Sequence, residues 1–146
     1  MRFMVLMHPG DTSYEKGAMP DPEAIAQMMK YNEELSKAGI LLALDGLHST
    51  SKGARITFSG GKSTTTDGPF TEARELIGGY WMWQVKSKEE AVEWARRCPA
   101  GEGDMLELRQ VFELSDFGPE VEANEGALAE EITKRNAENA RASSSS

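Results

Sequence analysis

The chain has 146 residues, a hydrophobic fraction of 39% and a charged fraction of 27%, which is typical of one globular domain with a hydrophobic core. Its net charge of −8 at pH 7 would repel polyanions, so we expect neither nucleic acid nor an anionic membrane as a partner. The apolar run of residues 3–7 is too short for a signal peptide or a membrane span. Because Cys98 is the only cysteine, no intrachain disulfide can form, and we expect a cytoplasmic protein.

The first part of the chain predicts a strand, a helix and a second strand. Residues 3–7 are apolar in both registers, as in a central strand. Asp21 and Pro22 mark a helix start, as N-cap and first helical residue, and Gly39 marks its end. Residues 40–44 form a short apolar strand. The expected buried stripe of the helix consists of Ile25, Met28, Met29, Leu35 and Ala38.

The second part predicts a hairpin, a strand, a helix and a last strand. Residues 54–58 alternate between apolar and polar, and Gly60-Gly61 joins them to residues 62–66 as a β-hairpin. Residues 77–85 are rich in aromatic side chains and strongly favour a strand. Ser87 and Glu90 form a capping box before a helix that Pro99 ends, and residues 105–112 are the last strand.

This order of elements predicts a ferredoxin-like α+β fold, a split β-α-β sandwich with an inserted hairpin. Both helices would cover the same face of an antiparallel sheet. Residues 3–7 and 77–85 are apolar on both faces, so the second face also needs a cover. We therefore expect a homodimer that packs sheet against sheet.

The chain is expected to divide after residue 118. Residues 1–118 would form the ferredoxin-like domain, and residues 119–146 an acidic C-terminal tail that is helical or disordered. From Glu113 to Arg141 there are eight acidic residues and three basic ones, with a thin apolar stripe, so a helix here would be marginal on its own.

Residues 66–75 concentrate ionisable side chains beside a stiff turn. Gly68 permits backbone angles closed to other residues and Pro69 fixes its own φ, so the preceding Asp67 is held in a defined direction. Clustered carboxylates raise one another's pKa values, which suits a general acid or base, and we predict Asp67, Glu72 and Glu75 as catalytic residues. The structural alternative is that Asp67 caps the turn and the glutamates form surface ion pairs.

His48 is the fourth predicted catalytic residue. A histidine beside a carboxylate can transfer protons near pH 7, and the predicted hairpin brings His48 and Asp67 to the same region. The alternative for His48 is an exposed loop histidine. His8 ends the first strand, where pockets often open, and is a further candidate for proton transfer.

Arg55, Arg109 and Tyr80 are the predicted substrate-binding residues. An arginine in an otherwise apolar strand can bind a carboxylate or phosphate through two parallel hydrogen bonds. For Arg109 the alternative is pairing with Glu107, which lies two positions away on the same face. Tyr80 and the neighbouring tryptophans can line an apolar pocket, or they can belong to the core or a dimer interface.

The run Asp67-Gly68-Pro69-Phe70-Thr71-Glu72-Ala73-Arg74-Glu75, followed by Gly78-Gly79-Tyr80-Trp81, resembles the DGPF signature of the YCII-related proteins. Weaker supporting segments lie at residues 38–47, 87–99 and 107–111. The resemblance covers residues 1–118. It implies a ferredoxin-like fold, a dimeric α+β barrel and a cytoplasmic bacterial protein, and it brings no assigned reaction.

Three functions fit these residues. The first is a small acid–base enzyme (a lyase, isomerase or hydrolase) acting on a small polar molecule. The second is a ligand-binding or regulatory module that uses the same residues, and the third is a structural or interaction protein. No His or Cys pair has the spacing of metal ligands and no glycine-rich phosphate motif occurs, so we expect neither a metal nor an organic cofactor.

Overall fold

The computed structural model describes residues 1–70 and 75–144 of the chain. It contains two units, Met1–Val111 and Phe112–Ser146. The described part of the first unit contains β1 (Arg2–His8), α1 (Pro22–Lys37), β2 (Leu41–Gly46), β3 (Ala54–Ser59), β4 (Lys62–Asp67), β5 (Gly79–Gln84), α2 (Lys88–Arg96) and β6 (Met105–Gln110), with short 3-10 helices η1 (Ser13–Lys16) and η2 (Thr50–Lys52). The second unit contains η4 (Leu114–Phe117) and α3 (Pro119–Ser144).

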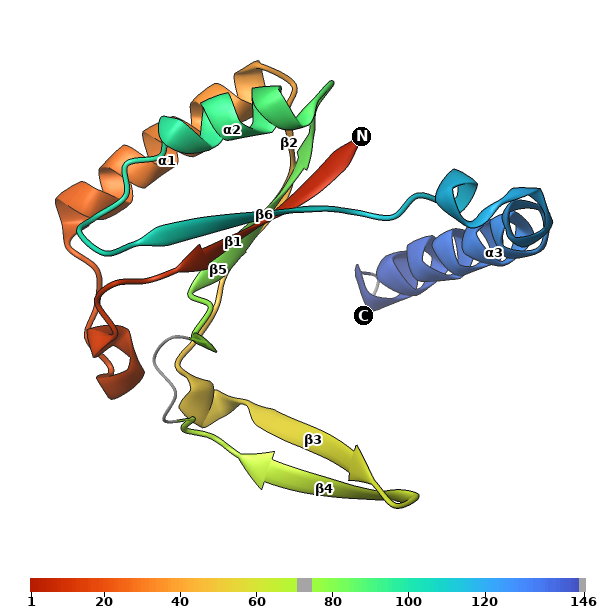
Figure 1. The fold of residues 1–146 in the computed structure, drawn as a ribbon, viewed down its shortest axis with the longest axis horizontal. Helices are drawn as coiled ribbons and strands as arrows, with labels where there is room; N and C mark the ends of the chain where they lie inside the picture. The colour runs from red at the N-terminus through yellow and green to blue at the C-terminus, as the bar shows by residue number, and fades with distance from the viewer. Residues whose placement is uncertain (71–74, 145–146) are drawn as a thin grey trace. The chain divides into compact units, whose positions relative to one another are not determined.

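Four strands form an antiparallel sheet in the order β2-β5-β1-β6. Helix α1 connects β1 to β2, and α2 connects β5 to β6, which gives two split β-α-β units. Both helices lie on the same side of the sheet (Figure 1). The ferredoxin-like α+β fold is therefore confirmed.

The strands β3 and β4 form a separate two-stranded sheet, the hairpin inserted between β2 and β5. Its loop is the pair Gly60 and Gly61, with φ angles of 57° and 75°. Positive φ at both central residues is the requirement of a type I′ turn, whose twist matches that of the flanking strands. The Gly-Gly hairpin expected from the sequence is thus present.

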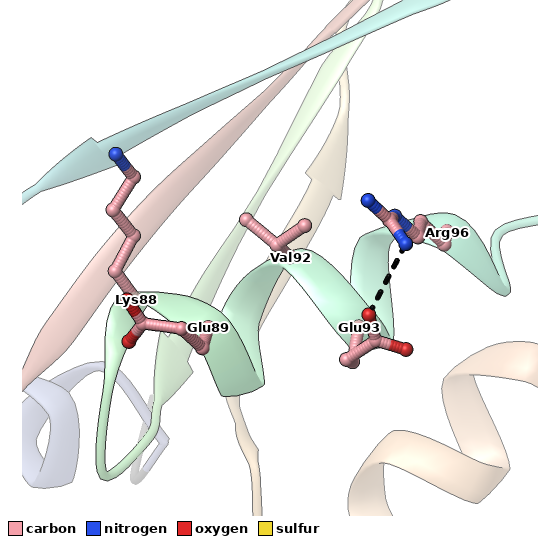
Figure 2. A pocket seen from close by; sticks show the side chains of 5 residues that line it. All are labelled: Lys88, Glu89, Val92, Glu93 and Arg96. Carbon is pink, nitrogen blue, oxygen red and sulfur yellow. Dashed lines mark hydrogen bonds and ion pairs between the residues drawn. The ribbon is translucent and has the colours of Figure 1, made fainter.

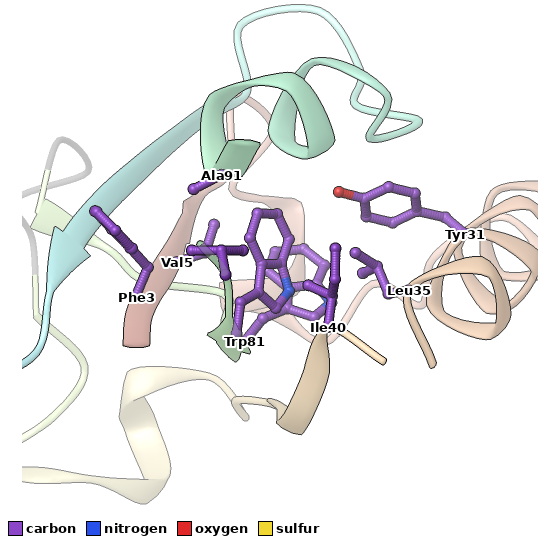
Figure 3. Packing of buried hydrophobic residues seen from close by; sticks show 9 residues of the cluster. Phe3, Val5, Tyr31, Leu35, Ile40, Trp81 and Ala91 are labelled. Carbon is purple, nitrogen blue, oxygen red and sulfur yellow. The ribbon is translucent and has the colours of Figure 1, made fainter. Parts of the chain in front are cut away.

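The core lies between the four-stranded sheet and the two helices (Figure 3). Alternate residues of the central strands point into it, so that Phe3 and Val5 of β1 pack with Trp81 and Trp83 of β5. The remaining fully buried members of this cluster are Tyr31, Leu35, Ile40, Val85 and Ala91. The two tryptophans predicted as either core or pocket wall are therefore core residues.

Two polar side chains inside this layer have hydrogen-bond partners, whereas the buried Nε1 of Trp83 has none among the described residues. The Tyr31 hydroxyl donates to the backbone oxygen of Trp94 at 2.7 Å, and Trp81 Nε1 donates to Asn32 Oδ1 at 2.8 Å. Burial raises the pKa of Tyr31 well above its ordinary value. These two bonds join α1 to α2 and to the sheet, and they fix how α1 lies on the core.

The buried stripe of α1 differs from the predicted one. Tyr31 and Leu35 are buried and Met28 packs against the core, whereas Ile25 is 41% and Met29 is 67% exposed. Neighbouring helix residues are about 100° apart around the axis, so Met29 points away from the sheet once Met28 faces it. The apolar pattern does not include Tyr31, because tyrosine carries a polar hydroxyl. A tyrosine can nevertheless be buried when that hydroxyl forms a hydrogen bond, as it does here.

The C-terminal unit is dominated by the long helix α3. Several of its apolar residues are exposed, including Val121, Leu128 and Ile132. Arg135 and Glu131 form an ion pair one turn apart at 2.6 Å. Within residues 1–70 and 75–144, no helix combines the length and apolar character that crossing a membrane requires.

The two α1 positions give a direct test of this packing. We expect Leu35→Ala to lower the free energy of unfolding by about 2–5 kcal/mol, because Leu35 is fully buried and its truncation leaves a cavity. Met29→Ala, on the same helix, should change it by no more than about 0.5 kcal/mol. Urea denaturation of both variants measures the two values. Equal losses would mean that the helix is rotated from its position here.

Candidate functional site

The face of the four-stranded sheet opposite the helices carries the polar side chains of the central strands. The strand register places Glu107, Leu6, Tyr80 and Asp45 in one row across β6, β1, β5 and β2. His8 follows Leu6 on the same face, at the end of β1. We call this group (Asp45, Tyr80, His8, Glu107 and Arg109) the polar cluster of the open face.

His8 is a largely enclosed ionisable member of the polar cluster. Its side chain is 16% exposed, and neither ring nitrogen has a hydrogen-bond partner among the described residues. Nε2 lies 3.6 Å from Oε1 of Glu107, close enough for an ion pair when the imidazole is protonated. An enclosed imidazole beside a carboxylate is suited to accept and return a proton.

The rest of the polar cluster flanks this pair on both sides. Arg109 Nη1 donates to Oε2 of Glu107 at 3.1 Å, which is the pairing that their same-face spacing predicts. On the other side, the Tyr80 hydroxyl donates to Asp45 Oδ2 at 2.7 Å. This hydrogen bond and the negative charge of Asp45 raise the pKa of Tyr80. Arg109 is mostly exposed, so its guanidinium can also reach an anion in solution.

The predicted signature turn is held by hydrogen bonds to η2 and to the glycine that follows it. Thr50 Oγ1 accepts from the backbone N–H of Phe70 at 2.9 Å, and Gly68 N–H donates to the backbone oxygen of Gly53 at 3.0 Å. A Cβ atom on Gly68 would lie 1.7 Å from the backbone oxygen of Thr50, so only glycine fits here. The Gly68-Pro69 peptide bond is cis.

Glu15 fixes Thr50 in turn. Its Oε1 accepts from the Thr50 backbone N–H at 2.9 Å and its Oε2 accepts from the Thr50 hydroxyl at 2.6 Å. These hydrogen bonds hold the pKa of Glu15 below its ordinary value, and the bond from the Thr50 hydroxyl has the largest effect. Burial and the negative charge of Glu15 raise the pKa of the neighbouring Tyr14. Glu15 and Thr50 thus join η1, η2 and the signature turn.

The predicted catalytic carboxylates are exposed where they are described. Asp67 is exposed at the end of β4, and Glu75 Oε2 lies 3.5 Å from Nη2 of Arg55. Arg55 also lies over the ring of Phe70, 4.0 Å from its centroid. Glu72 lies outside the described residues.

His48 is exposed in the loop between β2 and η2. The three predicted catalytic residues that the structure describes, Asp67, His48 and Glu75, are therefore exposed within one copy of the chain. Arg55 contacts both Glu75 and Phe70 and so helps to hold the signature turn.

A hollow of about 230 Å³ lies along α2 (Figure 2). It is lined by Lys88, Glu89, Val92, Glu93 and Arg96, and Arg96 pairs with Glu93 at 3.3 Å. The four charged residues are exposed and no enclosed polar group faces the hollow, so we do not regard it as the functional site.

Among residues 1–70 and 75–144, no group of three or more His, Cys, Asp or Glu side chains is placed to hold a metal ion. Cys98 is half-buried against the core, and burial, followed by the charge of Asp104, raises the pKa of its thiol to about 11. A thiol held protonated is a poor nucleophile.

Sequence reasoning did not identify the pairing of His8 with Glu107 or the role of Glu15. His8 was visible as the last residue of a strand, and Glu107 only as a partner for Arg109. Glu15 lies in a loop with no motif of its own, and only its hydrogen bonds to Thr50 reveal its role.

Comparison with known proteins identifies a family. The model of the YCII-related domain matches residues 1–115. A solved structure with a similar arrangement is 5-chloro-2-hydroxyhydroquinone dehydrochlorinase (TftG) from Burkholderia phenoliruptrix AC1100, in complex with 2,5-dihydroxybenzoquinone. It is 11% identical, with a TM-score of 0.38, and the match covers 82% of this chain and 100% of that one. No curated protein matches the sequence significantly.

The Glu15–Thr50 interaction predicts a specific pH dependence. Because the pKa of Glu15 is lowered on folding, its contribution to stability is present above the ordinary value of 4.5 and is lost as the pH falls through the folded-state pKa. We expect Glu15→Gln to be less stable than wild type near neutral pH and this difference to shrink in acid. Urea denaturation across this range measures it.

The Thr50→Val background is the control for this measurement. Without the Thr50 hydroxyl, Glu15→Gln should have a smaller effect at neutral pH, because part of the interaction is already missing. An equal effect in both backgrounds would show that Glu15 acts through some other group.

Proposed function

The chain belongs to the YCII-related family, and we propose that it is a small acid–base enzyme that acts on a small polar metabolite without a metal or organic cofactor. His8 is the proton-transferring residue, and Glu107 lies within ion-pairing distance of its Nε2. The reaction class is one in which a proton leaves one atom of the substrate and another atom receives one, as in isomerases, lyases and hydrolases.

The observation that carries the proposal is the state of the His8 imidazole. It is enclosed, it has no hydrogen-bond partner among the described residues, and a carboxylate lies within ion-pairing distance. Leaving an enclosed polar atom unpaired costs free energy, and such atoms need an explanation. A ligand that accepts or donates a hydrogen bond at His8 supplies one.

The flanking residues suit the recognition of a small polar ligand. Arg109 offers a guanidinium for a carboxylate or phosphate group, and Tyr80 offers a hydroxyl at the opposite end of the row. Asp45 orients the Tyr80 hydroxyl. The distribution of a cation and hydroxyl around one imidazole favours an anionic metabolite over an apolar one.

The proposal includes a homodimer in the cytoplasm. Met4, Leu6 and Met82 are half-buried on the open face, and the helices cover the other face. A second copy packed against this apolar part would remove it from water and leave the polar cluster at the edge of the contact.

A structural role for the signature turn is the second candidate, and one observation favours it. The turn forms hydrogen bonds with Thr50 and Gly53, and Arg55 forms an ion pair with Glu75. All of these contacts hold the shape of the turn. On this view Asp67 shapes the chain and does not react. The sequence-based alternative, in which Asp67 and His48 transfer the proton, stays a prediction.

Proton exchange tests the enzymatic role even while the substrate is unidentified. The probes are pyruvate, oxaloacetate and acetoacetate in deuterated water, and proton NMR follows the exchange of their C–H groups. We expect wild-type protein to accelerate exchange in at least one probe. His8→Gln should lower that rate by about 10²–10⁴-fold, the usual contribution of a general base.

Asp67→Asn is the matched comparison, since it also replaces one predicted acid–base group by an amide. The alternative predicts that Asp67→Asn keeps the fold and abolishes exchange. Exchange lost only in Asp67→Asn would refute the assignment of His8. Saturable binding of a probe with no exchange at any concentration would identify a ligand-binding module instead.

A further inference from the structure

A proline ends the pairing of β1 with β6 directly after His8. The register between the two strands runs to the pair His8 and Met105. The next residue, Pro9, has no backbone N–H and cannot donate a further bond to β6. The end of the strand that carries the proposed proton-transferring histidine therefore needs another group to hold it against β6.

The carboxylate of Asp104 is such a group. Its Oδ1 accepts from the backbone N–H of Gly10 at 2.8 Å, two residues beyond His8. Its Oδ2 accepts from the backbone N–H of Gly101 at 2.7 Å. Both bonds are charge-assisted, and such bonds are roughly twice as strong as neutral ones. One half-buried carboxylate thus joins the segment that leaves β1 to the loop that enters β6.

The two segments also touch directly. A Cβ atom on Gly10 would meet the backbone oxygen of Glu102 and would lie 2.6 Å from the carbonyl carbon of Gly103, so only glycine fits at position 10. Gly103 has a φ of 79°, which favours glycine at that position as well. The two backbones therefore lie in close contact, and the bonds of Asp104 keep them there.

The loop that carries Asp104 is anchored in the core. It follows α2, whose last turn is joined to α1 by the hydrogen bond from the Tyr31 hydroxyl to the backbone oxygen of Trp94. Cys98, at the start of the loop, packs against the hydrophobic core. The Asp104 N–H donates to the backbone oxygen of Gly101 at 3.2 Å and closes a turn. Asp104 is therefore a firm point of attachment for the segment after β1.

The other side of the same strand end is held by β5. The backbone N–H of Gly78 donates to the backbone oxygen of Met7 at 2.8 Å. A Cβ atom on Gly78 would lie 3.5 Å from two carbons of the Pro9 ring, so Gly78 also lies close to the proline. The end of β1 is thus fixed by Gly78 on one side and by Asp104 on the other.

The bond at Gly10 bears on His8 through a stiff stretch of backbone. Pro9 fixes its own φ and restricts the residue before it, His8, to extended backbone. The imidazole depends on this placement, because its Nε2 lies 3.6 Å from Oε1 of Glu107. Since an ion pair reaches to about 4 Å, a shift of about 1 Å would carry the imidazole out of range.

We propose that Asp104 is a positioning residue for His8, which holds Gly10 and so keeps the imidazole within reach of Glu107 and of a bound substrate. The inference rests on the proposed function, in which His8 transfers the proton. Asp104 acts through the backbone and takes no part in the proton transfer. Its loss would misplace His8 and leave the pair of Tyr80 and Asp45, on β5 and β2, as it is.

Two substitutions of Asp104 remove its bonds in steps. Asp104→Ala removes both acceptors, whereas Asp104→Asn keeps one oxygen and therefore part of the attachment. Asp11→Asn is the matched control, because it removes the same charge from the loop after β1. The Asp11 carboxylate accepts from the backbone N–H of Ser13 at 2.8 Å, within its own turn.

The position of the imidazole can be read by NMR without any substrate. In wild type we expect a nuclear Overhauser effect between the ring protons of His8 and the side chain of Glu107, because the two side chains lie close together. Asp104→Ala should lose this effect and exchange the Gly10 amide proton faster, and Asp11→Asn should match wild type in both. An unchanged effect in Asp104→Ala would overturn the inference.

The proton exchange of pyruvate, oxaloacetate and acetoacetate gives a kinetic readout. We expect Asp104→Ala to lower kcat by about 10-fold to 100-fold, the cost of misplacing a reacting group by about 1 Å. Asp104→Asn should lower it less, and both variants should keep KM within about threefold, because the misplaced group acts in the transition state. An equal loss of kcat in Asp11→Asn would show that charge and not position is responsible, and would refute the positioning role.

Two results separate this inference from the proposed function. If wild type exchanges no probe but Asp104→Ala loses the contact of His8 with Glu107, the positioning role stands and the enzymatic proposal loses its support. If wild type exchanges a probe and Asp104→Ala equals it in kcat and in the contact, the enzymatic proposal stands and the positioning role is wrong.

Discussion

The main constraint on this structure is that two helices cover only one face of a four-stranded sheet. The covered face buries Trp81 and Trp83 with Val5 and Leu35, and this layer holds the hydrophobic core. No described helix of the first unit is left to cover the other face. That face carries the half-buried Met4, Leu6 and Met82 and also His8, whose ring nitrogens have no hydrogen-bond partner among the described residues.

The second constraint is the hydrogen-bonded chain from Glu15 through Thr50 to Phe70. One carboxylate accepts both the backbone and the side-chain donor of Thr50, and the same hydroxyl accepts from the signature turn. Charge-assisted hydrogen bonds are roughly twice as strong as neutral ones, so Glu15 gives the three loops a common anchor. The turn then leads back to the sheet, where Gly78 N–H bonds to the backbone oxygen of Met7.

The sequence predicted the fold well because periodicity and turn chemistry are local. The order of strands and helices, the Gly60-Gly61 turn and the two-sided apolar character of β1 and β5 all follow from neighbouring residues. The site depends on register between strands far apart in the sequence. A shift of one residue between β1 and β6 would send Glu107 to the face opposite His8, and no local pattern fixes that choice. The rigid turn formed by Gly68 and Pro69 likewise does not determine which side chains lie beside Asp67.

The open face is divided in a way that lets one surface serve two purposes. Met4 and Met82 share a row with Ala43 and, on β6, with Arg109, while Glu107, Tyr80 and Asp45 share the next row with Leu6, towards the end of β1. Covering a charged group without a matching partner costs far more than covering a methionine. In the proposed homodimer, the second copy would therefore cover the methionines Met4 and Met82 and leave the charged side chains at the edge of the contact. On this proposal, the part of the face that the second copy leaves uncovered is the part where His8 and Glu107 would be accessible to a small molecule.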